Sequence, residues 1–363
     1  MVSLATASDS LKVWRFSEQS GLTLTSKFAP STNTLRLSST PAKQQQVPLQ
    51  SHMNAIAWNH TNQVIAISGM DSKIYLIQAN NGQVLSSLQI SESKINSAAV
   101  SFSNNSRYLT ATLGCKLQLW DLKKRQIKAV YSGHVDDVTA TCFTSQGDVV
   151  SGDKAGVVRL WDSKLSFHSL ADLRTSKTDS VTCVGTPFLG DAVVASGYSN
   201  GELCVWDTVT SQLLRSQACH KGSLSCLTYS TKNPRLIATV GSDGKIALID
   251  TSSQQSSGPS ASLVLADEPS INSISFHEDA IHSAVGFESG QVMVFDWRNI
   301  RRPVATLEAI NAAPVRAVAF QVQSLPACLS VYLSAIDSDR PQLLMVIGPS
   351  GWWLIGFVHQ VHQ

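Results

Sequence analysis

The stretch Lys116-Leu-Gln-Leu-Trp120-Asp121 decides the fold, because apolar and polar side chains alternate along it up to a Trp-Asp pair. Alternation with a period of two is the pattern of a β-strand with one face in a core. The same pattern returns at residues 73–78, 157–162, 202–207, 245–250 and 291–296. The final residues of successive copies are 41 to 46 residues apart. The chain is therefore predicted to consist of repeats of one β unit.

The rest of each unit is also strand-like. A short strand of small and β-branched residues precedes each copy, and a tight turn containing Gly156, Gly201, Gly244 or Gly290 lies between the two strands. Earlier still, an alternating strand ends in an aromatic residue, and a fourth strand follows the Trp-Asp pair. Four strands in about 40–45 residues are typical of WD repeats, so an all-β WD40 β-propeller is predicted.

The two ends of the chain determine the expected number of blades. Six full units occupy residues 53–310, whereas residues 4–8 and 11–16 supply only later strands of a unit and residues 314–320 only a first strand. Combining strands from both ends removes exposed sheet edges. We therefore expect a seven-bladed propeller whose closing blade is shared by N- and C-terminal strands.

Two segments fall outside the repeat. Residues 29–49 are rich in Ser, Thr, Gln and Pro and are expected to form a flexible insertion in a propeller domain of residues 1–320. Residues 321–363 are expected to be a divergent C-terminal tail without a coiled coil, since no heptad pattern is present. Two strand-like runs at 343–347 and 352–357 either add strands to the closing blade or belong to a divergent end.

Composition excludes several classes of function. With 28 Lys plus Arg against 26 Asp plus Glu, the net charge of +2 gives no strong field for nucleic acid or anionic lipid. The seven cysteines include no CxxC pair, which favours a reduced, intracellular protein. The most apolar run, 343–358, is interrupted by Gly and Pro and is shorter than a membrane span. Neither a nucleic-acid nor a membrane partner is expected.

Histidines and aspartates at repeated positions are the residues that suggest chemistry. His52, His134 and His220 each precede a blade, where such a histidine either binds a metal or hydrogen-bonds a Ser or Thr, a turn Asp and the Trp of the third strand. The structural role is favoured, although Ala155 replaces the turn Asp after His134 and Ile249 replaces the Trp after His220. The other predicted structural residues, one or two per blade, are Trp120, Trp161, Trp206, Asp121, Asp162, Asp207, Asp250 and Asp296.

No catalytic site is predicted. The aspartates lie one per blade, too far apart to share a proton, and are interpreted as turn and cap residues. The sequence contains no GxSxG, HExxH, P-loop or dinucleotide motif. We therefore expect neither an enzyme nor a bound cofactor or metal.

Two basic clusters follow third strands and are candidates for partner binding. They either are solvated loops or bind acidic protein surfaces. The first is Lys123, Lys124 and Arg125 with Lys128, and the second is Arg298 with Arg301 and Arg302. Around the second cluster, Phe295-Asp296-Trp297-Arg298 resembles the aromatic-Asp-x-Arg signature of WD-repeat substrate receptors for cullin-based ubiquitin ligases, so Phe295 and Asp296 are also candidates for partner binding.

Several blades resemble one family in particular. The segments that carry the resemblance are 58–62, 106–109, 119–123, 236–253, 295–298 with 303–304, and 315–321, and 236–253 is the most specific. They are similar to the WD-repeat adaptors that target γ-tubulin ring complexes to centrosomes and spindles, the neural-precursor-expressed developmentally down-regulated protein family. Members of that family continue past the propeller into a helical region that grips γ-tubulin complexes, and residues 321–363 have no such pattern.

The resemblance implies a non-catalytic protein-interaction scaffold, the targeting half of a module for γ-tubulin-dependent microtubule nucleation and spindle organisation. Its implied partners are the γ-tubulin ring complex or augmin-type spindle proteins. Its implied locations are the cytoplasm, spindle microtubules and microtubule-organising centres. The alternative, drawn from residues 295–298, is a substrate receptor of a cullin-based ubiquitin ligase.

Overall fold

A computed structural model describes the following residues of the chain. They are 2–4, 11–17, 21–28, 34–36, 46–48, 53–61, 63–69, 72–78, 83–91, 99–163, 169–175, 179–188, 190, 192–252, 261–264, 270–277, 279–307, 317–320, 342–348 and 352–358.

Six four-stranded antiparallel sheets, the blades, make up most of the described chain. Each is a meander in which strands adjacent in sequence pair. The first three blades are β6 (Met53–Trp58), β7 (Val64–Gly69), β8 (Lys73–Gln78) and β9 (Val84–Gln89); β10 (Val100–Phe102), β11 (Tyr108–Leu113), β12 (Lys116–Asp121) and β13 (Gln126–Ser132); and β14 (Val138–Phe143), β15 (Val149–Asp153), β16 (Val157–Trp161) and β17 (Ser169–Arg174).

The next three blades repeat this arrangement. They are β18 (Val181–Gly185), β19 (Val193–Tyr198), β20 (Glu202–Asp207) and β21 (Leu213–Ala218); β22 (Leu224–Tyr229), β23 (Leu236–Gly241), β24 (Lys245–Asp250) and β25 (Ala261–Val264); and β26 (Ile271–Phe276), β27 (His282–Phe287), β28 (Val292–Asp296) and β29 (Pro303–Leu307). A short 3₁₀ helix, η1 (Trp297–Asn299), connects β28 to β29.

Burial follows the strand order. Third strands are almost wholly buried, as in β12, whereas the fourth strand β13 is largely exposed. The core lies between neighbouring blades: Leu88 of one blade packs with Phe102 and Trp120 of the next. The pairing of β12 with β13 shifts register between Leu119 and Trp120, and equivalent shifts recur in other blades. Such bulges increase the strand twist that radial packing of blades requires.

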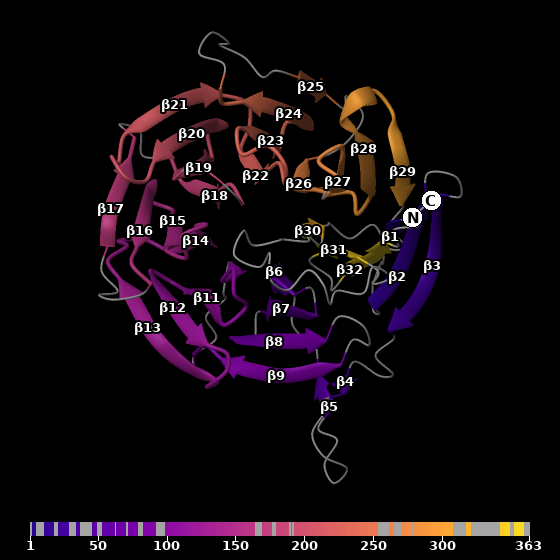
Figure 1. The fold of residues 1–363 in the computed structure, drawn as a ribbon, viewed down its shortest axis with the longest axis horizontal. Coiled ribbons are helices and arrows are strands. Elements are labelled where there is room, and N and C mark those ends of the chain that lie inside the picture. Colours follow the sequence, from indigo (N-terminus) through magenta and orange to yellow (C-terminus); the bar gives the residue numbers. More distant parts are fainter. Residues whose placement is uncertain are drawn as a thin grey trace, which may run out of the picture.

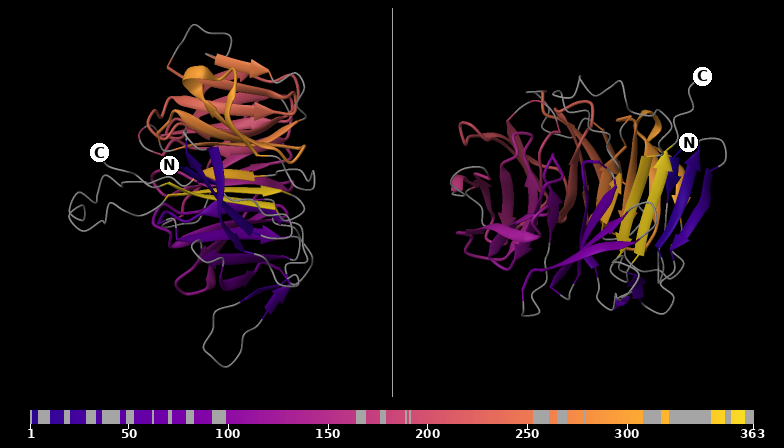
Figure 2. Two further views of the ribbon diagram at one scale, coloured as in Figure 1. Left: turned by 90° about the vertical axis from the view of Figure 1, so that its right-hand side faces the viewer. Right: turned by 60° about the horizontal axis from the view of Figure 1, so that its bottom comes forward.

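The blades stand around a ring. Figure 1 shows the first strand of each blade towards the centre and the fourth strand at the rim. First strands of neighbouring blades contact one another in sequence from β6 to β26. Figure 2 shows the strands running across the thickness of this disc. The predicted all-β WD40 propeller is confirmed.

The expected count of seven blades is wrong, because the structure has six four-stranded blades and a different kind of sheet where the two ends meet. This closing sheet has six strands in the order β3-β2-β1-β32-β31-β30. The strands are β1 (Val2–Leu4), β2 (Leu11–Ser17), β3 (Gly21–Phe28), β30 (Ala317–Phe320), β31 (Gln342–Gly348) and β32 (Trp352–Val358).

The physical reason for the difference is that each end contributes three strands to the closing sheet. The C-terminal strands β30, β31 and β32 form their own antiparallel meander, which pairs with β1 and β2. The strand-like runs at 343–347 and 352–357 thus join the closing sheet. β30 contacts β26 on one side and β6 on the other, so this sheet lies between the last and first blades.

Within the predicted insertion, β4 (Thr34–Arg36) pairs with β5 (Gln46–Pro48), and the other residues of 29–49 lie outside the described part of the chain. In the described part, no helix combines the length and the apolar character needed to cross a membrane.

The meander gives each blade two ends. The connections from first to second strand and from third to fourth strand lie at one end, which we call the Asp-loop face because Asp121, Asp207, Asp250 and Asp296 end third strands there. The turns from second to third strand lie at the opposite face.

Candidate functional site

A buried hydrogen-bond network links two strands of the β14–β17 blade, β15 and β16, to His134, which precedes the blade. Trp161 Nε1 donates to Ser151 Oγ at 2.7 Å, Ser151 Oγ lies 2.6 Å from His134 Nε2, and His134 Nδ1 lies 2.7 Å from Asp153 Oδ2. Ser151 and Asp153 have no exposed surface, and His134 is 7% exposed. The indole, hydroxyl, imidazole and carboxylate groups of this network all have hydrogen-bond partners, as burial requires.

One assignment of donors and acceptors satisfies every hydrogen bond of this network. Because the Trp161 indole can only donate, Ser151 accepts from it and turns its own proton to His134 Nε2, which leaves Nδ1–H to donate to Asp153. This arrangement needs a neutral imidazole. Burial lowers the pKa of His134 and outweighs the nearby Asp153 carboxylate, which acts in the opposite direction. Both ring nitrogens of His134 are thus held within this network.

The expected defect at Ala155 is filled by another residue. Asp153, two positions earlier, supplies the carboxylate from the end of β15. Asp153 pairs with Val138 at the start of β14. In the β22–β25 blade, Gly241 occupies the equivalent position, where it pairs with Leu224. In that blade a Cβ at position 241 would lie 2.6 Å from His220 Nδ1. The two blades thus place the acid at alternative positions.

The network around His220 is shorter. His220 Nδ1 lies 2.9 Å from Asp243 Oδ1, and Nε2 lies 3.0 Å from Thr239 Oγ1. Ile249 takes the place of the tryptophan and is fully buried. Burial lowers the pKa of His220, against the effect of Asp243.

The remaining predicted structural residues differ in their contacts. In the β18–β21 blade, Trp206 Nε1 donates to Ser196 Oγ at 2.9 Å. Trp120 Nε1 instead donates to Gln118 Oε1 at 3.1 Å. His52 lies outside the described residues.

The repeated aspartates bind the backbone of the turns that follow them. Asp121 Oδ1 accepts from the amides of Lys123 and Lys124, and Asp207 Oδ1 accepts from those of Val209 and Thr210.

The aspartates of two other blades make the same kind of contact. Asp250 accepts from the Ser252 amide and Asp296 from the Arg298 amide. At Asp162, the described contact is made by the backbone carbonyl, which accepts from Tyr131 Oη. Each aspartate serves its own blade, so the structure brings no two of them together as an acid–base pair.

The first basic cluster lies on the turn between β12 and β13. Lys123, Lys124 and Arg125 are all exposed there, and Arg125 has a φ of 53°. The Asp121 carboxylate holds the backbone of this turn through two amides, so a tight turn presents the three cations on the Asp-loop face.

Two further cations extend this cluster, and the sequence analysis missed one of them. Arg107, from the turn between β10 and β11, pairs with Asp121 at 3.2 Å and lies over the Tyr108 ring. Lys128 Nζ lies 4.3 Å from the centre of the same ring. We call Arg107, Lys123, Lys124, Arg125 and Lys128 the basic loop patch. Arg107 carries no sequence signal, because only the antiparallel pairing of β11 with β12 brings it beside the turn.

The second basic cluster is organised by an ion pair. The Arg298 guanidinium lies against Asp296, with Nη2 2.6 Å from Oδ2 and Nε 3.0 Å from Oδ1, while 66% of the Arg298 side chain remains exposed. Arg301 and Arg302 are exposed as well. Phe295 is fully buried in the core, which corrects its inclusion among the partner-binding residues, since it has no surface to offer a partner.

The structure does not join the two basic clusters. They belong to the β10–β13 and β26–β29 blades, which are not neighbours in the ring (Figure 1). Each is therefore a separate surface of the Asp-loop face.

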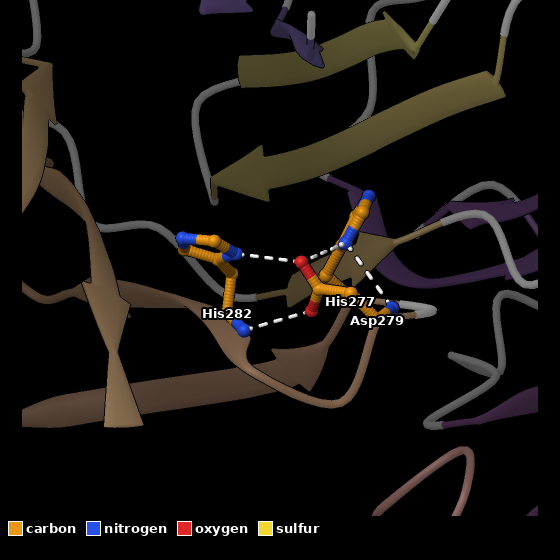
Figure 3. Close-up of side chains that lie close together, drawn as sticks. All are labelled: His277, Asp279 and His282. Carbon is orange, nitrogen blue, oxygen red and sulfur yellow. Dashed lines mark hydrogen bonds and ion pairs between the residues drawn. The ribbon is translucent and has the colours of Figure 1, made fainter. Parts of the chain in front are cut away.

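A histidine cluster that the sequence analysis missed lies at the turn between β26 and β27. His282 Nδ1 is 2.6 Å and His277 Nδ1 is 3.0 Å from Asp279 Oδ2, so both imidazoles point at one carboxylate oxygen (Figure 3). Burial alone would raise the pKa of Asp279, but hydrogen bonds from the two histidines hold it far below its usual value. The sequence pattern that could have revealed this cluster is the His-x-Asp-x-x-His spacing within a single turn.

Comparison with protein families gives three partial matches, all to propellers or their repeats. Residues 175–337 match the Nucleolar protein 10-like, N-terminal domain, residues 1–105 match the Anaphase-promoting complex subunit 4 WD40 domain, and residues 125–162 match the WD domain, G-beta repeat.

Curated relatives give a longer match. The chain is 24% identical to Protein NEDD1 of Homo sapiens over 324 residues, which cover 88% of this chain and 45% of that protein. It is 28% identical to Autophagy-related protein 16 of Arabidopsis thaliana over 199 residues, covering 54% of this chain and 38% of that protein. It is 28% identical to the guanine nucleotide-binding protein subunit beta of Zea mays over 155 residues, which cover 39% of this chain and 40% of that protein.

Proposed function

We propose that this chain, a NEDD1-like WD-repeat protein in its propeller part, is a non-catalytic scaffold that docks other proteins in γ-tubulin-dependent microtubule nucleation and spindle organisation. The observation that carries the proposal is the extent of the NEDD1 similarity, 88% of the chain, against about half or less for the other relatives described above. Fold alone does not support it, because propellers host many unrelated functions.

The proposed role is that of a targeting half. The chain spans about 45% of the length of the NEDD1 relatives it matches, so the activity of those whole proteins does not transfer to it directly. A rigid disc with separate exposed loops is suited to holding a partner at a fixed place. The partners we propose are the γ-tubulin ring complex or augmin-type proteins on spindle microtubules and at microtubule-organising centres.

The basic loop patch is the proposed docking surface. Five cations lie close together there, and the described partner of Arg107 is the buried Asp121 carboxylate. Exposed positive charge of this kind favours an acidic protein surface and speeds association with it. The Asp121 capping contacts fix the turn in advance, which reduces the entropy lost on binding.

Imaging in dividing cells tests the proposal. The chain, tagged with a fluorescent protein and co-stained for γ-tubulin and microtubules, is expected on spindle microtubules or poles. Charge reversal at Lys123, Lys124 and Arg125 should disperse it, whereas reversal at Arg301 and Arg302 is the matched control and should not. A wild-type signal that is diffuse or purely nuclear would refute the targeting role.

A second candidate function rests on the Asp296–Arg298 pair. A cullin-ligase adaptor would need an exposed arginine held in place, and Asp296 holds Arg298 in this way at 66% exposure. Arg298→Ala separates the two functions: it should abolish adaptor binding if the chain is a substrate receptor and leave spindle association unchanged if it is a targeting scaffold.

A further inference from the structure

The cluster of His277, Asp279 and His282 has the composition and placement of a ligand set. All three residues come from one turn of the β26–β27 hairpin, on the Asp-loop face. The ligand atoms of the three side chains lie within 4.8 Å of one another. Figure 3 shows the carboxylate between the two imidazole rings.

The turn fixes the carboxylate in advance. Asp279 Oδ1 accepts hydrogen bonds from the amides of Ile281 at 2.7 Å and His282 at 2.9 Å. The other oxygen, Oδ2, is thereby directed at both imidazole Nδ1 atoms. The histidines are largely buried, with 8% of the His277 and 13% of the His282 side chain exposed, so their rings are held by packing as well.

The distances are close to those around a tetrahedral metal ion. Zinc bonds to histidine nitrogen and carboxylate oxygen of about 2.0–2.1 Å place neighbouring ligand atoms about 3.3 Å apart in a tetrahedron. The observed Nδ1 to Oδ2 distances are 3.0 Å for His277 and 2.6 Å for His282. His277 Nδ1 also accepts from the Asp279 amide at 3.3 Å, and the three ligand atoms all lie within 4.8 Å of one another. A divalent cation among them lengthens the two Nδ1 to Oδ2 distances by about 0.3–0.7 Å and takes the place of the amide contact at His277 Nδ1.

We propose that His277 Nδ1, Asp279 Oδ2 and His282 Nδ1 bind one Zn²⁺ ion. Two imidazoles and one carboxylate suit zinc better than Mg²⁺ or Ca²⁺, which require oxygen ligands. The fourth position takes water from the side of Asp279, the most exposed member, whose side chain is 29% exposed. This assigns a metal site where the sequence analysis expected none.

An outer layer of charge supports the site. Zinc-binding histidines ordinarily direct their second ring nitrogen at a carboxylate or a carbonyl, which orients the ring. His282 Nε2 lies 4.0 Å from Asp296 Oδ2, and Asp296 is itself held by Arg298. His282 and Asp296 are cross-strand partners in the β27–β28 pairing. The aromatic-Asp-x-Arg motif thus reaches the histidine cluster from the next strand.

Zinc binding to the full-length chain tests the proposal. The protein is dialysed against EDTA, returned to buffer, and titrated with ZnCl₂ by calorimetry, and X-ray absorption at the zinc edge then gives the ligand shell. We expect one ion per chain, an N/O shell at about 2.0–2.1 Å, and an increase in melting temperature on zinc addition. If the titration shows that the chain does not bind one equivalent of zinc, the proposal is overturned.

Variants locate the ion. His282→Gln and, separately, Asp279→Asn should each weaken zinc binding at least tenfold, and Asp279→Asn retains the Oδ1 contacts that hold the turn. Circular dichroism of each variant establishes that it is folded. The matched control is His359→Gln with His362→Gln, the other closely spaced histidine pair in the sequence. Zinc binding that is lost in this control and kept in Asp279→Asn would place the ion elsewhere and refute the proposal.

Discussion

Removing one hydroxyl group, in Ser151→Ala, tests whether the buried chain from Trp161 to Asp153 stabilises the propeller. The change leaves two buried polar atoms without a partner, Trp161 Nε1 and His134 Nε2, which now lie 2.7 and 2.6 Å from Ser151 Oγ. Each unsatisfied buried group costs about 1–3 kcal/mol, so the loss in unfolding free energy should be about 2–6 kcal/mol.

The β22–β25 blade supplies a matched comparison. Thr239→Val is nearly isosteric and removes the described contact of the Thr239 hydroxyl, which is to His220 Nε2 at 3.0 Å. A second contact like that of Trp161 is not made here, because the buried Ile249 occupies the position of the tryptophan. One unsatisfied atom instead of two predicts a loss of about 1–3 kcal/mol, half that of Ser151→Ala. Ser132→Ala, at an exposed position of β13, should change the unfolding free energy by less than about 0.5 kcal/mol.

Thermal unfolding followed by calorimetry measures the difference. An unfolding entropy of about 2.1 cal/mol/K per residue gives about 0.76 kcal/mol/K for this chain, so Ser151→Ala should lower the melting temperature by about 3–8 °C and Thr239→Val by about 1–4 °C. If Thr239→Val lowers it as much as Ser151→Ala or more, the two networks do not differ in the way their contacts indicate, and the reasoning fails.

Three further predictions concern the folded chain. Because burial lowers the pKa values of folded His134 and His220, the folded chain takes up fewer protons than the unfolded chain below about pH 6.5. Stability should therefore fall from pH 7.5 to 5.5, by up to about 1.4 kcal/mol per histidine, and the slope should flatten when both are replaced by Gln. Gly201→Ala should destabilise by about 2–5 kcal/mol in urea unfolding, because φ is +81° and a Cβ would meet the His220 carbonyl. Gly114→Ala, at φ +55°, should cost about 1–2 kcal/mol, because its Cβ would meet Asp137 Oδ1 at an ordinary contact distance of 3.6 Å. Arg298→Ala should change the melting temperature by less than about 1.5 °C, since its ion pair with Asp296 is exposed, and a larger fall would show a structural role.

Local sequence pattern predicted the blades well because their strands pair with near neighbours. Alternation, the Trp-Asp pair and a glycine turn are all readable within about 40 residues. The closing sheet could not be predicted in the same way, since β1 pairs with β32 from the far end of the chain, and no local pattern records which strands of two ends will meet.

The candidate sites show a similar limit. The cations at 123–125 are adjacent in sequence and were predicted, but Arg107 joins them only through sheet pairing. Asp153 was missed because the expected acid belonged at Ala155, and only the geometry shows that a strand end reaches the same histidine. Phe295 was misplaced because strand alternation leaves its side chain in the core while Asp296 begins the loop.

The pairing of β1 with β32 has a consequence for synthesis on the ribosome. The two strands are separated by almost the whole chain, and at about 5–20 residues per second translation between them takes roughly 20–70 s. During that interval the six blades can form in order, while β1 to β3 present strand edges that have not yet met their partners. Unpaired edges recruit other chains. The segment that contains β1 to β3 is therefore the one whose shielding by a chaperone would most affect how much of the chain reaches the closed ring.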